Sequence, residues 1–388
     1  MTNLGDRLHS LVRAGIEQGV FPGAAVSVRK KGQLVLNDTF GHAEIVPKVR
    51  AMRAGMTFDI ASLTKVMATL PAVLRTVRAG KVSLDRPIAD YLPEWGAEGS
   101  RRAVTLTHLL THTSGLPAWR PYYVRLHTAE EYCRQICREP LEYEPCTRVV
   151  YSDLGMQLAG FLLERIWQKS LVEICSQLVF EPLELSATGF YAQHDVPVPS
   201  TSKESQIGPI FVATEVGNVL EHGMCMEYAE KCRTGMLPEG AFFITEQDIA
   251  ALAWRTATSY GTVNDGNCYY GLHGISGHAG LFSTVEDVAR YLAMWREGGQ
   301  VGGQTYLDRD LVSLVVSNRT KGLNLARGLG FEIAYKSNAF GHTGFTGTSL
   351  WYDPESDTEA VVLTNRVHPQ VKAGIVDWRR TFHSVAFE

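Results

Sequence analysis

Ser62 and Lys65 are spaced so that a lysine amine could activate a serine hydroxyl. Both lie in the run FDIASLTK at residues 58–65. A serine hydroxyl is a weak nucleophile at neutral pH, and a base within hydrogen-bond reach is the usual means of activating it. Residues three apart on a helix share a face, so a helix starting here would bring the Lys65 amine to the Ser62 oxygen. The pair therefore predicts nucleophilic catalysis at Ser62.

The Ser-x-x-Lys pattern alone is weak evidence, because a second copy stands at residues 200–203. That copy lies in a stretch rich in proline and serine, which lacks apolar periodicity and is typical of a loop. The copy at Ser62 is followed by a mostly apolar segment, residues 66–77, in which Pro71 would kink a helix or occupy a position that needs no donor. Gly80 would end that helix. We therefore expect the chemistry at Ser62.

Tyr151 is a candidate for moving the serine proton. It precedes a segment, residues 154–166, in which apolar side chains recur at helical spacing. Ser152 is a natural N-cap for that helix, and Asp153 in the first turn suits the helix dipole. A tyrosine beside an ammonium can have its pKa lowered, because the charge favours the phenolate. Tyr151 could then take the proton of Ser62 and return it to a leaving group, and the alternative is an ordinary core aromatic.

A glycine-rich run, GHTGFTG at residues 341–347, leads into a late strand. Glycines at this density let a ligand approach the backbone closely. His342, Thr343 and Gly344 are therefore candidate substrate-binding residues. The alternative is a simple turn that enters the strand.

The elements that must position these residues include strands at both ends of the chain. Segments 24–28 and 34–36 flank a polar turn, which predicts a hairpin, and segments 348–352 and 360–364 repeat the pattern. Between the two hairpins the periodicity is mainly helical, and a capping box from Ser283 to Glu286 opens one helix. The simplest assembly is an α+β fold, in which both chain ends share an antiparallel sheet flanked by helices.

This assembly predicts two lobes with a cleft between them, a common place for a ligand site. We expect residues 1–75 and 275–388 to form the lobe with the central sheet, and residues 76–274 to form a mostly helical lobe. Within the helical lobe, residues about 191–240 are rich in proline, serine and glycine and predict a long irregular insertion.

The composition is that of an ordinary globular protein and excludes several classes of partner. The 388 residues are 45% hydrophobic and 20% charged, with a formal net charge of −4. The sequence contains no basic block of the kind that predicts nucleic-acid binding, and none of its apolar runs reaches membrane-spanning length. The N-terminal segment lacks the apolar core of a signal peptide. We expect a cytoplasmic protein with a small-molecule substrate, and no feature predicts its oligomeric state.

Neither a metal nor a cofactor is predicted. The seven cysteines include no Cys-x-x-Cys pair, and free thiols fit a reducing compartment. His108 and His112 are four apart, as in zinc helices, but Leu109 replaces the glutamate that such a motif requires. His278, in a glycine-rich turn, is expected to be structural.

Three motifs in order carry a resemblance to a known family: Ser-x-x-Lys at Ser62, Tyr-Ser-Asp at Tyr151 and His-Thr-Gly at His342. Further matches are the runs LTHLLTHTSGLP at 106–117 and GHAGLFST at 277–284. In these features the chain resembles the serine beta-lactamase and penicillin-binding-protein superfamily over about residues 21–366. The likeness is greatest to the class C beta-lactamase-like branch, which includes esterases, D-stereospecific peptidases and acyltransferases.

The resemblance implies roles for the candidate residues. Ser62 would be the nucleophile, Lys65 the neighbouring amine and Tyr151 the phenol that shuttles the proton. The backbone N–H groups of Ser62 and Phe345 would form the oxyanion hole, a donor pair aimed at the charge that develops during acyl transfer. The identity of the base is disputed in some members of the superfamily, and both Lys65 and Tyr151 stay open here.

Two positions depart from the usual motifs of that superfamily. The strand motif usually begins with lysine, whereas His342 should be largely neutral at pH 7. The second motif usually ends in asparagine, whereas the carboxylate of Asp153 cannot donate to a substrate carbonyl and would instead stabilise a protonated Lys65. We therefore expect a neutral ester or amide, or a substrate bearing a cation, with weak or absent turnover of beta-lactams.

The sequence thus predicts a carboxylesterase-like serine hydrolase that acts on small esters or amides through an acyl-enzyme at Ser62. An acceptor alcohol or amine in place of water would make it an acyltransferase, and D-amino-acid peptidase activity fits the same fold. A different class of function also stays open, namely a penicillin-binding or sensing protein that remains acylated.

Overall fold

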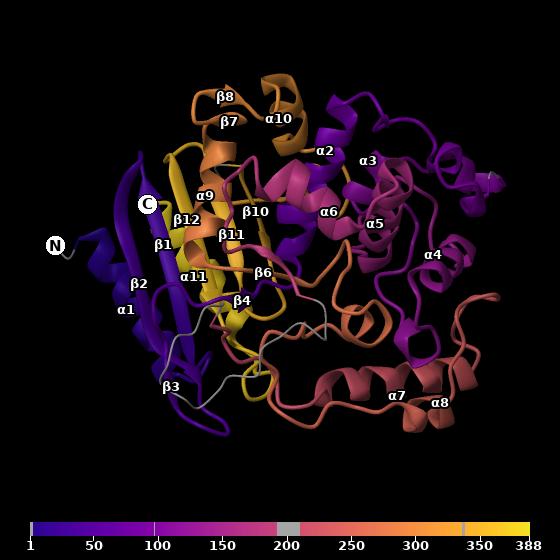
Figure 1. The fold of residues 1–388 in the computed structure, drawn as a ribbon, viewed down its shortest axis with the longest axis horizontal. Helices are drawn as coiled ribbons and strands as arrows, with labels where there is room; N and C mark the ends of the chain where they lie inside the picture. The colour runs from indigo at the N-terminus through magenta and orange to yellow at the C-terminus, as the bar shows by residue number, and fades with distance from the viewer. Residues whose placement is uncertain (1–2, 97, 192–209, 336–337) are drawn as a thin grey trace.

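The computed structural model describes residues 3–96, 98–191, 210–335 and 338–388. Strands from both chain ends meet in one sheet at one side of the molecule, and the middle of the chain forms helices at the other side (Figure 1). The second Ser-x-x-Lys copy, at residues 200–203, lies outside the described residues.

The main sheet has seven strands in the order β3-β2-β1-β12-β11-β10-β9, and its paired strands are antiparallel. The pairing of β1 with β12, which sets Ala24 opposite Thr364, joins the two chain ends. The predicted hairpins and the α+β fold are confirmed. In chain order the strands are β1 (Gly23–Lys30), β2 (Gln33–Glu44), β3 (Arg50–Ala51), β9 (Glu332–Ala334), β10 (Ala339–Thr343), β11 (Ser349–Asp353) and β12 (Thr358–Thr364).

Two smaller sheets accompany the main one. The first has the order β4-β6-β5 and consists of β4 (Phe58–Asp59), β5 (Gly189–Phe190) and β6 (Leu281–Ser283). The second pairs β7 (Gln300–Val301) with β8 (Gln304–Thr305). The pairing of β4 with β6 brings the segment before Ser62 beside the segment after His278.

The helices make up most of the rest of the described chain. The α-helices are α1 (Leu4–Glu17), α2 (Leu70–Arg78), α3 (Leu106–Leu110), α4 (Ala129–Arg138), α5 (Asp153–Trp167), α6 (Leu171–Cys175), α7 (Val219–Arg233), α8 (Glu246–Ala251), α9 (Val285–Arg296), α10 (Arg309–Val316) and α11 (Ile375–Ala386). Short 3₁₀ turns are η2 (Ile88–Asp90), η3 (Pro93–Trp95), η4 (Gly99–Ala103) and η5 (Tyr122–Val124), and π-helical turns are η1 (Lys65–Thr69), η6 (Ser176–Phe180) and η7 (Asn267–Gly271).

Helices cover both faces of the main sheet. Every residue of β12 is buried, and its side chains alternate between two cores, as a strand buried on both faces requires. Ala360 and Val362 pack with α1 and α11, whereas Val361 and Leu363 join the large core that includes α9. This sandwiching makes the sheet a rigid base for the residues at the ends of its strands.

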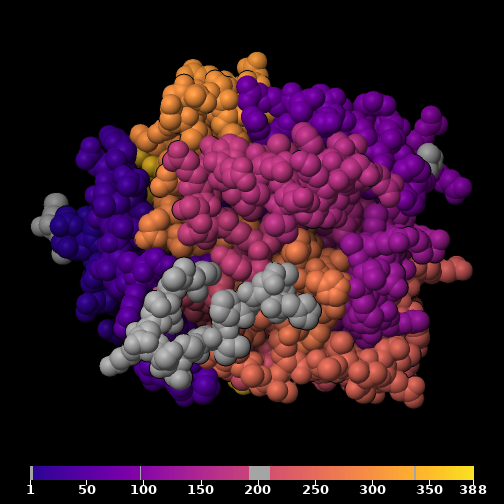
Figure 2. Space-filling view, viewed as in Figure 1, coloured from indigo at the N-terminus to yellow at the C-terminus, as the bar shows by residue number. Residues whose placement is uncertain are grey.

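The helical side of the molecule is built from the middle of the chain. Helices α3 to α8 gather there in the ribbon view (Figure 1), and the space-filling view shows their segments as one continuous mass beside the N-terminal strands (Figure 2). Among the described residues, none of the helices is both long enough and apolar enough to cross a bilayer.

Two local predictions are wrong. Residues 219–233, inside the expected irregular insertion, form α7. Its sequence gave little sign of a helix because few of its side chains are buried and Val219 and Leu220 are exposed. The helix α9 begins one residue later than the expected capping box, because the side chain of Thr284, and not Ser283, accepts the amide of Asp287. Ser283 instead ends β6.

Candidate active site

A strained turn delivers Ser62 to the surface of a cavity. Strand β4 ends at Asp59, and Ala61 has a positive φ of 48°, a conformation that costs energy for a residue with a side chain. The carboxylate of Asp59 stabilises this turn, because it accepts the Ala61 amide at 2.8 Å and the Asn264 amide at 2.7 Å. Ser62 lines a cavity of about 520 Å³.

The helix after Ser62 starts with a π-helical turn, η1, which includes Lys65. In this turn the amide of Leu70 bonds to the carbonyl of Lys65, one residue further along than in an α-helix. Pro71 follows in the first turn of α2, where its missing donor costs no hydrogen bond. The helix ends at Arg78, and Gly80 follows with a φ of 68°, as the sequence predicted.

Lys65 is buried, and its ammonium makes two hydrogen bonds and one ion pair. The Nζ atom lies 2.9 Å from Ser62 Oγ, 2.9 Å from the carbonyl oxygen of His278 and 2.8 Å from Asp153 Oδ1. Burial opposes the charge, but the Asp153 carboxylate and Tyr151 outweigh it, so the pKa of Lys65 lies above its ordinary value. The free site therefore holds a charged lysine that donates to the serine oxygen.

Tyr151 packs beside this pair, just before α5. The Ser152 side chain caps the helix by accepting the Gly155 amide at 3.2 Å, as predicted. The Tyr151 hydroxyl is buried and lies near Ser62 and Lys65 without forming a hydrogen bond of normal geometry to either. Burial raises the pKa of Tyr151 despite the opposing effect of Lys65. The expectation of a lowered pKa is thus wrong, because removal from water outweighs the nearby charge.

His342, Thr343 and Gly344 lie where β10 ends and line the same cavity as Ser62. Burial, with the cations Arg327 and Lys65, holds the pKa of His342 well below its usual range. Its Nδ1 lies 2.8 Å from the Thr343 carbonyl oxygen, and its buried Nε2 has no hydrogen-bond partner among the described residues. The strand motif therefore presents a neutral imidazole, as the sequence indicated.

The loop after β10 holds Phe345 against the nucleophile turn. Thr346 donates to the Asp59 carbonyl at 2.7 Å, and Thr348 donates to the Ile60 carbonyl at 3.0 Å. Over the described residues, the backbone N–H groups of Ser62 and Phe345 make no hydrogen bond within the protein. Both residues line the cavity, so two free donors are available there for a developing oxyanion.

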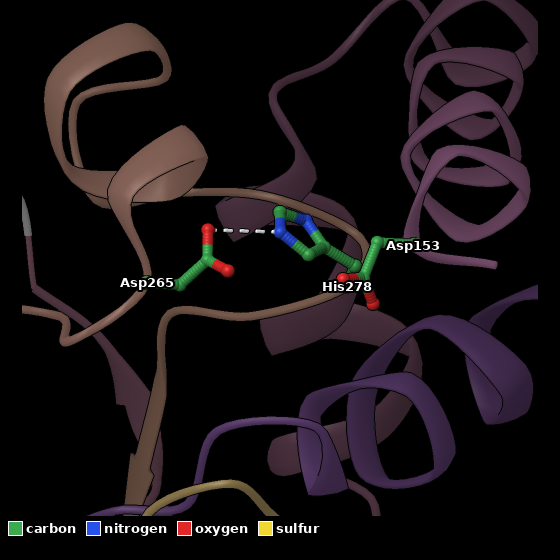
Figure 3. A group of neighbouring side chains, drawn as sticks. All are labelled: Asp153, Asp265 and His278. Atoms are coloured by element: carbon green, nitrogen blue, oxygen red, sulfur yellow. Dashed lines mark hydrogen bonds and ion pairs between the residues drawn. The ribbon is translucent and has the colours of Figure 1, made fainter. Parts of the chain in front are cut away.

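A cluster of three polar side chains lies next to Lys65. Asp153, Asp265 and His278 offer ligand-type atoms that all lie within 4.8 Å of one another (Figure 3). Asp153 already pairs with Lys65, and Asp265 Oδ1 lies 3.0 Å from His278 Nε2. His278, which the sequence analysis expected to be structural, thus contacts the site.

The histidine pair of the 106–117 run has structural contacts. The Nδ1 atom of His108 accepts the Thr105 amide and that of His112 accepts the Ser152 amide, each at 3.1 Å. The ring of His112 also packs on Tyr151, with centroids 4.6 Å apart. These contacts hold the start of α3 and the start of α5 in place beside the site.

Sequence reasoning missed the cations of the cavity. Among the residues that the structure describes, one acidic side chain, Glu332, lines it with four basic ones, Arg327, Arg366, Lys372 and Arg379. Arg327 is buried, its guanidinium carbon lies 5.4 Å from the Tyr151 ring centroid, and its Nε and Nη1 atoms have no partner among the described residues. No local pattern marks Arg327, because the fold alone brings it to Tyr151. This excess of positive charge disfavours a cation-bearing substrate, since like charges repel, and the substrate preference stays a prediction.

Known proteins match this chain over nearly its whole length. The family model for Beta-lactamase matches residues 8–383. An N-acetylmuramyl-L-alanine amidase of Bacillus subtilis (strain 168) is 28% identical over 393 residues, which covers 94% of this chain and 81% of the relative. A protein of Escherichia coli (strain K12) named "Putative D-alanyl-D-alanine carboxypeptidase" is 26% identical over 381 residues, covering 90% of this chain and 80% of the relative.

Solved structures share the fold. EstCE1, described as a hydrolase with promiscuous acyltransferase activity, superposes with a TM-score of 0.70 at 21% sequence identity. The superposition covers 99% of this chain and 98% of EstCE1. The sheet and the helical side therefore form a known arrangement.

Proposed function

Because the chain belongs to the beta-lactamase family, we propose that it is a serine hydrolase that cleaves small esters or amides through an acyl-enzyme at Ser62. One observation carries this proposal: Ser62 Oγ lies 2.9 Å from a buried lysine amine, on a cavity with two free backbone donors. Nucleophile, neighbouring charge and oxyanion donors are the parts that acyl transfer needs.

In the proposed mechanism Lys65 stays charged and Tyr151 moves the proton. The pKa of Lys65 is raised, so its nitrogen is protonated at neutral pH and has no lone pair to take the Ser62 proton. A neutral Tyr151 hydroxyl can accept that proton while it gives its own to the leaving group, and a raised pKa does not prevent such a relay. Ser62 attacks the carbonyl, the oxyanion binds the Ser62 and Phe345 amides, and the leaving group departs protonated. In the second half of the reaction, water attacks the acyl-enzyme carbonyl. Tyr151 accepts the proton of the water and gives its own to Ser62 Oγ, which releases the carboxylic acid product.

The charges of the cavity favour substrates that carry a carboxylate. Arg327 offers unpartnered donors near Tyr151, and a buried cation gains most from a charge-assisted pair. This observation favours the second candidate function, D-amino-acid peptidase activity, in which the leaving group is an amino acid. Two relatives named for amide cleavage, an amidase and a carboxypeptidase, agree with that candidate. Acyl transfer to an alcohol or amine uses the same acyl-enzyme, as the name of EstCE1 suggests.

A substrate panel tests the proposal. Nitrophenyl esters, D-amino-acid amides, dipeptides ending in a D-residue, penicillins and cephalosporins are incubated with the wild-type protein, Ser62→Ala and Ser200→Ala. Short esters should be hydrolysed, with all activity lost in Ser62→Ala and kept in Ser200→Ala. The weak lactam turnover expected from the neutral His342 is tested in the same panel, because the cavity cations can pair with a lactam carboxylate. Efficient lactam hydrolysis without ester hydrolysis would overturn the substrate assignment. A Ser62 adduct that never clears would instead support a sensing protein.

A further inference from the structure

Asp265, which is partly buried, and His278, which is buried, form a pair next to Lys65. His278 Nε2 lies 3.0 Å from Asp265 Oδ1, and its Nδ1 lies 2.7 Å from Ser276 Oγ (Figure 3). Both ring nitrogens are thus held, so the imidazole has one orientation. The ring is 1% exposed, which leaves it no contact with a substrate in the cavity.

The backbone of His278 connects this pair to the reacting residues. Its carbonyl oxygen accepts from Lys65 Nζ at 2.9 Å. The flanking turn is fastened to the helix that carries Lys65, because Thr69 donates to the Gly277 carbonyl at 2.6 Å and Thr64 accepts the Leu281 amide at 3.1 Å. The side chain of His278 therefore fixes a carbonyl that holds one of the three Lys65 donors.

Asp265 also adds a second negative charge near Lys65. The titratable groups that interact with Lys65 come from several segments, and they are Tyr151, Asp153, Asp265, Cys268, His112 and His342. Only Asp153 and Asp265 of this set are carboxylates, and the ligand-type oxygens of the two lie within 4.8 Å of each other. Two carboxylates so close need a cation beside them, and the Lys65 ammonium supplies that charge.

Two other interpretations are weaker. A metal ion held by Asp153, Asp265 and His278 would displace the Lys65 ammonium, which sits 2.8 Å from Asp153 Oδ1. A purely structural role for Asp265, which accepts the Cys268 amide at 2.8 Å, would not require a buried histidine on the same oxygen. Neither interpretation accounts for the carbonyl contact to Lys65.

We propose that Asp265 and His278 are positioning residues for acyl transfer, which hold Lys65 as an ammonium with one donor aimed at Ser62. The inference rests on the proposed serine hydrolase function. It predicts that the pair affects the rate at which Ser62 is acylated, and the pH range over which Lys65 stays charged. The affinity for substrate should not depend on the pair, because neither residue reaches the cavity.

The test is the rate at which a fluorophosphonate labels Ser62 between pH 7 and pH 12, a range that includes the raised pKa of Lys65, followed by intact mass. Asp265→Asn keeps the size and one acceptor but removes the charge, so the pKa of Lys65 should fall. We expect labelling at pH 7 to slow about tenfold and the alkaline limit to move down by about one pH unit. His278→Ala should slow labelling similarly, and His278→Gln, which can still bond to Asp265, should recover most of the rate. In hydrolysis, kcat should fall while KM stays within about twofold.

A matched control separates positioning from lost stability. His368 is another buried histidine held by both ring nitrogens, against the Val46 and Ile45 amides and the Thr214 carbonyl, and it lies outside the site. His368→Gln should lower the melting temperature without moving the pH limit. If Asp265→Asn keeps the wild-type pH profile, or loses labelling only as far as it loses folded protein, the inference is wrong. A wild-type protein that is never labelled would instead overturn the proposed function.

Discussion

At the scale of single residues, the site is organised around one charged lysine. Lys65 donates to Ser62 and to the His278 carbonyl, each at 2.9 Å, and forms an ion pair with Asp153 at 2.8 Å. The departure from asparagine at Asp153 explains this state, because a carboxylate stabilises the ammonium that an amide would leave unpaired. This arrangement supports the proposed Tyr151 relay over a lysine base.

Tyr151→Phe should separate activity from stability. Over the described residues the hydroxyl is buried without a hydrogen bond of normal geometry, so its removal should leave the free energy of unfolding unchanged or raise it by up to about 1 kcal/mol. The same change should lower kcat by roughly 10²- to 10⁴-fold, the usual contribution of a proton-transfer group. Denaturant unfolding and ester hydrolysis measure the two effects.

Tyr306→Phe is the matched control for that variant. The Tyr306 hydroxyl donates to the Leu178 carbonyl at 2.8 Å, far from the cavity lining. Its loss should cost about 1 kcal/mol of stability and leave kcat unchanged. A Tyr151→Phe enzyme that works at the wild-type rate would contradict the relay.

At the scale of elements, three segments distant in sequence meet at the turn before Ser62. The Asp59 side chain accepts from the 264 loop, and its backbone carbonyl accepts from Thr346 in the loop after β10. Sequence motifs located the nucleophile turn and the β10 loop. They could not show that Asp59 joins them, because the joining hydrogen bonds span 205 and 287 positions of sequence.

Asp59 should make stability depend on pH. Burial raises its pKa from 3.8 to about 6, so the folded state holds a proton that the unfolded state releases. The resulting stabilisation is complete below pH 4 and is lost as the pH rises through 6, by about 3 kcal/mol. The wild-type free energy of unfolding should therefore fall by that amount relative to Asp59→Asn between pH 4 and pH 7, as measured by urea unfolding. A constant difference over this range would refute the assignment.

Gly277 sets the distance between α5 and the His278 turn. A Cβ at this position would lie 2.2 Å from the Met156 carbonyl oxygen and 3.2 Å from the Gly160 Cα. Gly277→Ala should therefore cost about 1–3 kcal/mol of stability and lower kcat, because α5 carries Asp153. Thermal unfolding and ester hydrolysis report the two losses.

Gly223→Ala provides the opposite result on another helix. Gly223 lies within α7, and a Cβ there would meet no atom within 4 Å. The change should stabilise the protein by about 0.5–1 kcal/mol with no effect on rate. Equal behaviour of the two glycine variants would show that the close approach at Gly277 does not matter.

At the scale of the whole molecule, the fold places a basic cavity where the sheet meets the helical side. The sequence predicted the shared sheet because apolar segments that flank polar turns at both chain ends indicate hairpins. It did not predict the charge of the cavity, because Arg327 and Arg379 come from segments without a recognised motif. It also missed α7, whose exposed apolar residues hide its helical pattern.

Arg327→Gln should raise the KM of substrates that carry a carboxylate and leave the KM of neutral substrates nearly unchanged. Loss of a charge-assisted contact costs about 1.5–3 kcal/mol, or roughly 10- to 100-fold in KM, for a substrate with a free carboxylate. A neutral nitrophenyl ester has no such group, so its KM should stay nearly constant and serves as the internal control. A preference for anionic substrates that survives in this variant would place the carboxylate contact at another residue.

The most direct measurement of the central claim is the intact mass of the protein after exposure to a fluorophosphonate. The wild-type protein and Ser200→Ala, which alters the second Ser-x-x-Lys copy, should each gain one adduct, and Ser62→Ala should gain none. An adduct that persists in Ser62→Ala, or its absence from the wild-type protein, would contradict the assignment of Ser62 as the nucleophile.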